Sequence, residues 1–175
     1  WTTTPWTLPG NMAIGVNPAF EYVEISLEGA GFEGKKYILA QGRLEVVLKD
    51  KKYEILRTFK GKDLVGKSYT PLFDYYLNTQ LEENAWKVYA ADFVTLDDGT
   101  GVVHEAPAFG DVDLKLAQEN GIPVVHHVGF DGKFKDEIKD FAGLWVKPKD
   151  DKENGIDHTD TDVEIIKYLA HNGKL

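Results

Sequence analysis

The sequence contains no cysteine, so disulfide bonds and thiolate metal sites are both excluded. It has no apolar run long enough to span a bilayer, and no secretory signal pattern opens it. The sequence also lacks an excess of basic residues. It has 20 Lys and Arg and 29 Asp and Glu, which gives a net charge of −9. Since phosphate neutralisation supplies most non-specific affinity for nucleic acids, this charge argues against a free-standing nucleic-acid binder. We expect a protein of a reducing compartment, the cytoplasm, whose RNA contacts are local or are supported by a larger protein.

The remaining composition is that of an ordinary folded domain. The 175 residues are 42% hydrophobic and 28% charged, which is enough for one domain with a sizeable core. The sequence starts at Trp1 without an initiator methionine, inside what reads as a strand or turn. We therefore interpret residues 1–175 as a single domain excised from a larger protein.

The densest chemical signal lies in Gly99–Asp113, which reads GTGVVHEAPAFGDVD. Val102–Val103 predicts a short buried strand, and His104 follows it as the side chain whose ordinary pKa lies nearest neutrality. A proline and a glycine then break the backbone, and a helix is predicted to begin near Asp113 and to end at Gly121.

Asp113 falls in the first turn of this predicted helix, where exposed N–H groups and the helix dipole favour a carboxylate. The strand, the bent loop and the helix N-terminus are expected to bring His104 and Asp113 to the rim of one pocket. The spacing alone leaves a second interpretation equally open, namely a helix-terminal acid beside a histidine that is satisfied in the core.

The opening stretch, Trp1–Pro9, reads WTTTPWTLP. Its three β-branched threonines favour an extended backbone, and Pro5 holds Thr4 in that conformation. We expect a strand end whose hydroxyl groups face outward beside the large wall of Trp6. In isolation the stretch is also typical of a polar sheet edge with a packed tryptophan.

Elsewhere, alternating or continuous apolar residues predict strands at Met12–Val16, Phe20–Leu27, Lys35–Ala40, Tyr53–Phe59, Val88–Val94 and Pro123–Val128. A short helical face at Leu44–Leu48 and a final helix with a Thr161–Glu164 capping box, ending at Gly173, complete the elements. Adjacent His126 and His127 would point to opposite faces of a strand and therefore do not chelate one metal ion together. Because strands outnumber the short, scattered helices, the predicted fold class is α+β, with a β-barrel-like core and short peripheral helices.

The two stretches WTTTPWTLP and GTGVVHEAPAFG, with Asp113 behind the second, together resemble the editing domain of isoleucyl-tRNA synthetases. This domain is the connective polypeptide 1 insertion of that class I enzyme family. The resemblance covers nearly the whole chain, although Glu28–Lys87 matches less specifically. The leucine and valine relatives tend to have an arginine where this chain has Thr4, and Ala108–Phe109 is more similar to the eukaryotic-like branch.

The resemblance implies a hydrolase that corrects mischarging. An isoleucine pocket cannot strongly reject valine, which is one methylene smaller, and isoleucyl-tRNA synthetases are themselves a standard example of the remedy, a second and smaller hydrolytic site. By this resemblance the domain would cleave the ester of valyl-tRNA(Ile), with valyl-adenylate as a further candidate substrate, while excluding isoleucine by size.

The resemblance also assigns roles to residues. Asp113 would hold the α-ammonium group of the misattached amino acid, because a charge-assisted bond orients a small substrate strongly. Thr2, Thr3 and Thr4 would bind the terminal adenosine and the aminoacyl group, with Thr3 counted among the catalytic residues. Trp6 and His104 would wall the side-chain pocket, and His104 would also help to position the water.

The implied partners are the 3′ end of tRNA(Ile) carrying valine and the remainder of the parent synthetase, with no membrane contact, no cofactor and no metal ion. We expect the domain itself to be monomeric. The sequence has no HIGH-like and no KMSKS-like segment, so it is not expected to catalyse ATP-dependent aminoacylation.

Three alternatives stay open from the sequence. The first is an editing domain of the valyl- or leucyl-tRNA synthetase type, against which Thr4 argues. The second is a module that binds an amino acid or nucleotide without turnover. The third is a purely structural β-barrel domain, which the two motifs make the least favoured.

Overall fold

The computed structural model describes residues 2–77, 79–81, 83–146 and 159–174, and the contacts between them divide the chain into two compact units. Unit 1 consists of Thr2, Ala13–Tyr69 and Lys87–His104. Unit 2 consists of Thr3–Met12, Thr70–Trp86 and the described part of Glu105–Leu175. Each unit is therefore built from stretches that lie far apart in the sequence.

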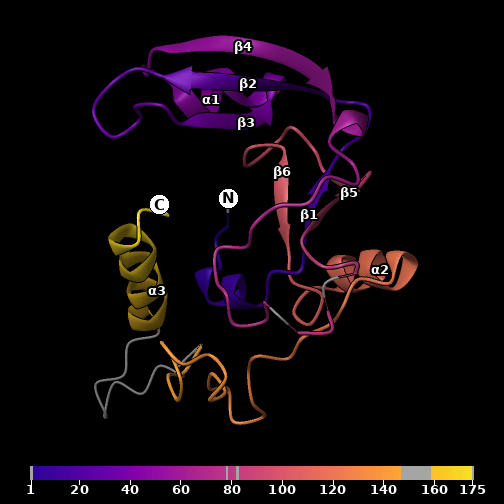
Figure 1. Cartoon of the computed structure of the whole chain (residues 1–175), viewed down its shortest axis with the longest axis vertical. Helices are drawn as coiled ribbons and strands as arrows, with labels where there is room; N and C mark the ends of the chain where they lie inside the picture. The colour runs from indigo at the N-terminus through magenta and orange to yellow at the C-terminus, as the bar shows by residue number, and fades with distance from the viewer. Residues whose placement is uncertain (1, 78, 82, 147–158, 175) are drawn as a thin grey trace. The chain divides into compact units, whose positions relative to one another are not determined.

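Unit 1 contains two three-stranded sheets (Figure 1). The first has the antiparallel order β3-β2-β4, with strands Lys36–Ala40, Glu21–Leu27 and Tyr53–Lys60. The second has the order β5-β1-β6, with strands Lys87–Ala90, Ala13–Val16 and Val102–Glu105, and β1 runs parallel to β5. Both are open sheets, so the described residues form no closed barrel, and the barrel-like core stays a prediction. The α+β class is confirmed.

The core of unit 1 forms where apolar residues of β2 face inward. Val23 and Ile25 of β2 pack with Leu39 of β3 against Leu44 and Leu48 of the short helix α1 (Leu44–Leu48). Tyr22 is fully buried in a second cluster, and its hydroxyl donates a 2.7 Å hydrogen bond to the carbonyl of Gly101. The strands and the short helix predicted in this unit are confirmed, although β5 is four residues shorter at its end than the predicted Val88–Val94.

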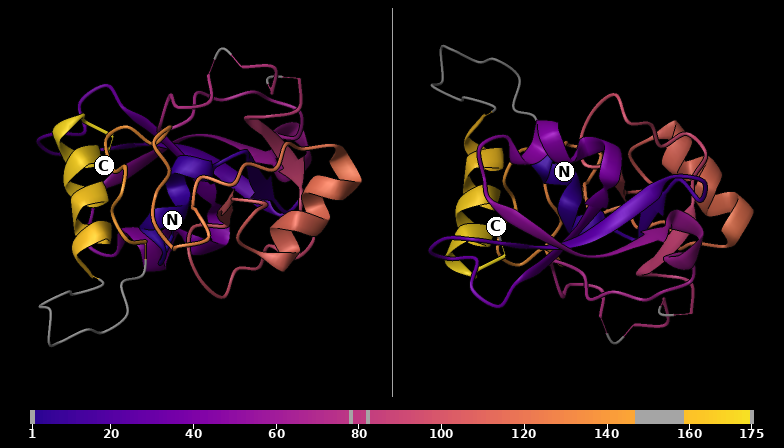
Figure 2. Two further views of the ribbon diagram at one scale, coloured as in Figure 1. Left: turned by 90° about the horizontal axis from the view of Figure 1, so that it is seen from below. Right: turned by 90° about the horizontal axis from the view of Figure 1, so that it is seen from above.

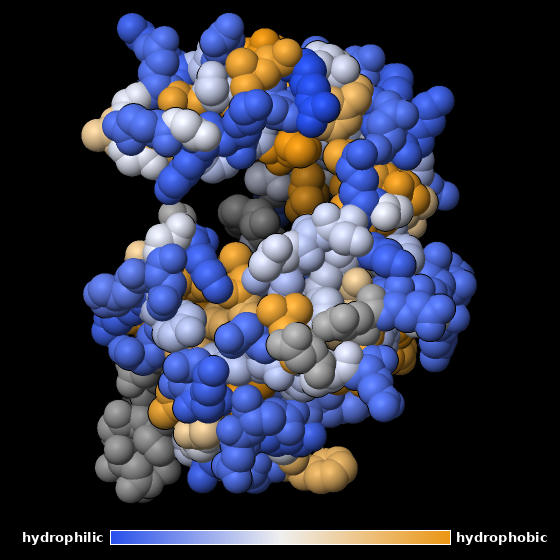
Figure 3. All heavy atoms as spheres, in the orientation of Figure 1, coloured by the Kyte–Doolittle hydropathy of each residue, from blue (hydrophilic) through white to orange (hydrophobic). Residues whose placement is uncertain are grey.

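The outer surface of unit 1 is mixed in character. Figure 3 shows mostly hydrophilic side chains on the face seen there, with hydrophobic side chains interspersed. Along β3 and β4 the exposed hydrophobic residues are Ile38, Ile55 and Leu56. The acidic Glu24 of β2 is paired with Lys36 and Arg57 of its two neighbouring strands, which fixes the register on that face.

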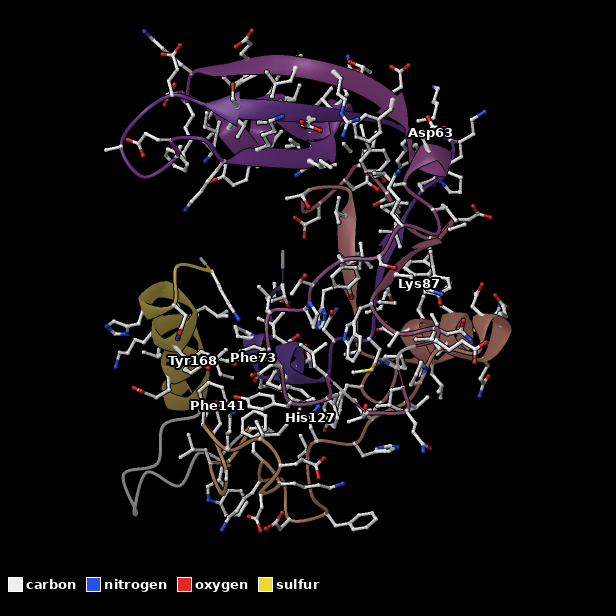
Figure 4. The ribbon with its side chains drawn as sticks, viewed as in Figure 1. Asp63, Phe73, Lys87, His127, Phe141 and Tyr168 are labelled. Carbon is white, nitrogen blue, oxygen red and sulfur yellow. The ribbon has the colours of Figure 1, made fainter. Side chains whose placement is uncertain are left out.

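Unit 2 is built from a 3-10 helix, η1 (Pro5–Gly10), two α-helices, α2 (Asp111–Asn120) and α3 (Thr159–His171), and long irregular segments. Its core gathers apolar residues from α3 and from the irregular segments, namely Phe73, Phe134, Ile138, Phe141, Val146, Ile165 and Leu169. Figure 4 shows Phe73, Phe141 and Tyr168 together, with ring centroids 5.4 to 6.0 Å apart. Figure 2 shows α3 beside the segment that precedes Val146, against which it packs.

Three sequence expectations in unit 2 are wrong. The threonine-rich opening is not a strand end, because the backbone turns into η1 at Pro5. Pro123–Val128 forms no strand, since its one bridge is the isolated one from Val128 to Phe134. Thr161 does not cap α3, because the helix begins at Thr159 and the Thr161 hydroxyl donates to the carbonyl of Trp145. Among the described helices, none has the length and apolar character needed to cross a membrane.

Candidate functional site

The candidate site in unit 2 is centred on the loop between β6 and α2. The backbone N–H of Phe109 donates to the carbonyl of Ala106, which closes a tight turn, and Pro107 is buried inside it. α2 then begins at Asp111, with Gly110 in an extended conformation as its N-cap. The predicted helix is confirmed, and its C-cap is Gly121, whose positive φ of 65° suits glycine.

Asp113 lies in the first turn of α2, as predicted, but its carboxylate does not cap that helix. It reaches back across the loop, where Oδ2 accepts a 2.7 Å hydrogen bond from the backbone N–H of Ala106. The side chain is half-buried. A carboxylate held in this way keeps lone pairs for a second donor and has limited freedom to turn away.

Gly110 makes room for this arrangement. An ideal Cβ at this position would lie 2.7 Å from Oδ1 of Asp113 and 3.0 Å from its Cγ. Any larger residue would therefore push the carboxylate out of its place beside Ala106. The requirement is steric, since the φ of −145° at Gly110 is accessible to all residues.

Glu105, the last residue of β6, carries a second carboxyl group beside Asp113. Its side chain is 0% exposed, and neither carboxyl oxygen has a hydrogen-bond partner within the described part of the chain. Its backbone carbonyl accepts a 3.0 Å hydrogen bond from the N–H of Met12. Burial, reinforced by the negative charge of Asp113, raises the pKa of Glu105 to about 8.

Aromatic residues form the other side of the loop. The ring of Phe109 meets Trp6 edge-to-face at 5.1 Å and His127 at 4.6 Å, and His127 stacks on Phe134 at 5.6 Å. Nε2 of His127 lies 3.0 Å from the carbonyl of Trp6. Burial lowers the pKa of His127 to about 4, so the ring is neutral and the Nε2–H tautomer donates this bond. Figure 4 labels His127 within unit 2.

The threonine segment is tied to the rest of unit 2 at Trp6. The backbone N–H of Trp6 donates a 3.1 Å hydrogen bond to Oδ1 of Asp162 in α3. The carbonyl of Thr4 accepts hydrogen bonds from both the N–H and the hydroxyl of Thr7. Thr3 is exposed and Thr4 is half-buried. Both threonines lie at the start of this hydrogen-bonded turn.

Comparison with known proteins relates this chain to the isoleucine–tRNA ligases. The chain is 44% identical to an isoleucine–tRNA ligase of Clostridium kluyveri over 97% of its length, and 42% identical to the cytoplasmic isoleucine–tRNA ligase of Schizosaccharomyces pombe over all of it. The chain is homologous to one segment of the isoleucine–tRNA ligases. It spans only 14 to 16% of the length of these two relatives. No family model matches it.

The fold of this ligase segment is also found among solved structures. The crystal structure of GlLeuRS-CP1 aligns with a TM-score of 0.52, at 16% identity, over 70% of this chain and 48% of the other. At that identity the likeness concerns the fold alone. It agrees with the α+β class, and the sequence comparison confirms the resemblance to isoleucyl-tRNA synthetases.

The candidate residues of the ligase segment are divided between the two units. Thr3, Thr4, Trp6 and Asp113 belong to unit 2, where Trp6 and Asp113 contact the two ends of the same loop, at Phe109 and Ala106. Thr2 and His104 belong to unit 1, with His104 half-buried in β6. A pocket shared by His104 and Asp113 therefore stays a prediction.

Sequence reasoning missed the parts that Glu105 and Phe109 play at the site, treated Gly110 only as a break in the backbone, and considered His127 only as a metal ligand. Alternation along β6 was the available signal for Glu105, because it places Glu105 and His104 on opposite faces of the strand. His126 is exposed and His127 is buried, so the two histidines do face opposite ways even without a strand. Among the described residues, no cluster of three or more His, Asp or Glu is arranged to hold a metal ion.

Unit 1 has an open cavity of about 620 Å³, lined by residues 19–21, 41–42, 60 and 96. None of the candidate site residues lines it. Its two charged side chains, Glu21 and Lys60, pair with each other at 3.3 Å. The cavity therefore offers no unpaired charge to a ligand.

Proposed function

We propose that this chain is a hydrolytic editing domain of an isoleucine–tRNA ligase and that it removes valine from valyl-tRNA(Ile). The homology to isoleucine–tRNA ligases supports the parent enzyme. The observation that carries the chemistry is the half-buried carboxylate of Asp113, anchored by the Ala106 N–H at 2.7 Å and free to accept a further donor.

In this proposal Asp113 receives the α-ammonium group of the misattached amino acid. An ammonium–carboxylate bond is charge-assisted and therefore orients a small substrate better than a neutral bond does. Trp6 and His104 bound the space for the amino-acid side chain, so valine enters and isoleucine is excluded. Thr2, Thr3 and Thr4 contact the terminal adenosine and the ester through hydroxyl and backbone groups.

The reaction is hydrolysis of an ester that is already activated. The oxygen of a water molecule attacks the ester carbonyl carbon, and the bond between that carbon and the ribose oxygen breaks. The ribose oxygen leaves with one proton of the water, which gives free valine and uncharged tRNA. Orientation of the water can supply most of the acceleration. Thr3 and His104 orient the water, and hydroxyl or N–H groups stabilise the negative charge that develops on the carbonyl oxygen.

The distribution of charge supports a shared role in binding tRNA. In unit 1 the Lys and Arg residues equal the Asp and Glu residues in number, so the whole net charge of −9 belongs to unit 2. An acidic unit repels the RNA backbone at long range. Unit 2 therefore recognises the terminal adenosine and the amino acid, while unit 1 and the parent ligase provide contacts to the rest of the tRNA.

A panel of charged tRNAs tests the proposal. The purified chain is incubated with valyl-tRNA(Ile), isoleucyl-tRNA(Ile) and threonyl-tRNA(Val), each with and without EDTA, and release of the amino acid is followed. We expect hydrolysis of valyl-tRNA(Ile) alone, unaffected by EDTA. Preferential hydrolysis of threonyl-tRNA(Val) would assign the chain to the valine type of editing domain, and binding of a valyl-adenosine analogue without turnover would reduce it to a binding module. Loss of activity in EDTA, restored by zinc, would overturn the metal-free mechanism.

A further inference from the structure

The buried carboxyl group of Glu105 requires a physical explanation. The side chain is 0% exposed, and its two oxygens receive no hydrogen bond from the described residues. An ionised carboxylate in such a place would cost several kcal/mol, a large part of the whole stability of a domain. The group is therefore a neutral carboxylic acid, which has one O–H to donate.

The carboxylate held beside Glu105 is that of Asp113, whose Oδ2 accepts a 2.7 Å hydrogen bond from the N–H of Ala106, the next residue along the chain. The negative charge of Asp113 acts on the buried Glu105 carboxyl and helps to raise its pKa. The segment 5–12, which contacts the Glu105 backbone through the Met12 N–H, reads PWTLPGNM and has no titratable side chain. His104 precedes Glu105 in β6 and so points to the opposite face of the strand.

We propose that Glu105 is a positioning residue for Asp113, whose carboxylic acid group donates a hydrogen bond to the Asp113 carboxylate and holds it ready for the ammonium group of the substrate. The proposal rests on the proposed function, which gives Asp113 its contact with the ammonium group. The carboxylate then has two anchors, the Ala106 N–H on Oδ2 and the Glu105 O–H, and its remaining lone pairs face the substrate.

Two neighbouring carboxyl groups that share one proton carry a single negative charge between them. This charge is matched to one ammonium group. When Glu105 loses its proton, the second negative charge repels Asp113 and the anchoring bond is lost. The pair therefore holds Asp113 in place only while Glu105 stays protonated, which at a pKa of about 8 includes neutral pH.

Two substitutions separate positioning from packing. Glu105→Gln keeps the size of the side chain and an N–H donor for Asp113 but cannot ionise. Glu105→Leu has a similar size and no donor. Glu119→Gln is the matched control, because Glu119 is an exposed acid on the same helix as Asp113. Each protein is assayed for kcat and KM on valyl-tRNA(Ile) and for its free energy of unfolding, from pH 5 to pH 9.

We expect Glu105→Gln to keep kcat/KM within about threefold of wild type at pH 7, and Glu105→Leu to lose about tenfold or more, as for one hydrogen bond to a charged group. The Leu variant should lose activity mainly through a higher KM, and its free energy of unfolding at pH 7 should not fall. Wild-type activity from Glu105→Leu, or a Gln variant as inactive as the Leu variant, would overturn the positioning role.

The unfolding measurement does not depend on editing activity. The pKa of Glu105 is raised in the folded protein from an ordinary value of 4.5 to about 8, so the folded state binds the proton more tightly. The stabilising contribution is complete below pH 4.5 and is lost as the pH rises through 8. Wild type and Glu119→Gln should show this loss, and Glu105→Gln should not. If the loss is present but no editing occurs, the proton-sharing pair stands and the proposed function fails; identical pH curves for wild type and Glu105→Gln would overturn the pair itself.

Discussion

Ala106 and Asp113 are joined by a 2.7 Å hydrogen bond from the backbone N–H of the first to Oδ2 of the second, seven residues along the chain. The bond closes the loop between β6 and α2, because Ala106 at the start of the loop binds the side chain of Asp113 at the start of the helix that follows it. The direction of the Asp113 carboxylate is thus set by local backbone geometry, and it can be disturbed at Asp113 itself or at the glycine beside it.

Replacement of Asp113 should remove the contact with the ammonium group. We expect Asp113→Ala to lower kcat/KM for valyl-tRNA(Ile) by about 100-fold, which corresponds to a charge-assisted bond worth up to about 3 kcal/mol. The fold should survive, because the half-buried side chain leaves no large cavity in the core. Asp113→Asn is the control, since it keeps an acceptor for Ala106 but lacks the charge. Deacylation by Asp113→Ala at a rate near wild type would contradict the assigned role.

Enlargement of the pocket should relax its exclusion of isoleucine. If His104 is one of the walls, His104→Ala should allow the domain to hydrolyse isoleucyl-tRNA(Ile), which the unchanged chain leaves intact. The gain is limited, since one methylene is worth only about 1–3 kcal/mol of discrimination. The measurement is the ratio of kcat/KM values for the two charged tRNAs. A variant that still clears valyl-tRNA(Ile) and leaves isoleucyl-tRNA(Ile) untouched would show that His104 does not set the size limit.

Substitution of Gly110 should displace the Asp113 carboxylate by direct contact. Gly110→Ala would place a Cβ 2.7 Å from Oδ1, so the side chain must leave its position beside Ala106. We expect a loss of kcat/KM similar to that of Asp113→Ala, with a loss of stability of about 1–3 kcal/mol from overpacking.

A double-mutant cycle isolates this contact. In an Asp113→Ala background the clash is gone, so Gly110→Ala should cost little further stability. Additive losses of stability in the double variant would mean that Gly110 acts through another contact.

Acid should weaken unit 2 through His127. The pKa of this buried histidine is lowered from an ordinary 6.5 to about 4, so the unfolded chain takes up the proton first as the pH falls. The stabilising contribution is complete above pH 6.5 and is lost as the pH drops towards 4, by up to about 1.4 kcal/mol per pH unit. Urea unfolding at pH 7 and pH 5 measures the change. His127→Gln can still donate to the Trp6 carbonyl but does not titrate there, and its smaller decline would confirm the assignment; an equal decline would refute it.

The sequence predicted secondary structure best where all the residues that define an element lie within that element or at its ends. β2 and the helix α2 follow from alternation, from an acid in the first turn and from the glycine at residue 121. Pro123–Val128 misled for a physical reason: Val125 and His127 alternate inward as they would in a strand, yet no neighbouring strand pairs with this stretch beyond Val128. Alternation reports burial, and it does not report a hydrogen-bonding partner.

The site shows the same limit. Asp113 was predicted from helix-terminal electrostatics and from the resemblance, but its actual hydrogen bond runs to a backbone group that no side-chain pattern encodes. Glu105 was missed because glutamate is rarely fully buried, and a sequence pattern assigns it to solvent by default. The bond between Trp6 and Asp162 joins residues 156 positions apart, a separation at which local pattern carries no information.

That long connection has a consequence for how the protein is made. Unit 1 has all of its residues once His104 has left the ribosome, whereas unit 2 still lacks Ile165 and Leu169 of its core and the Asp162 anchor of Trp6. Domains fold as units during synthesis, so unit 1 can fold first. Residues 3–12 can take their final place only after α3 has been synthesised. Within residues 1–175, the unit that carries Asp113 is thus completed after unit 1, although its residues 3–12 precede most of unit 1 in the sequence.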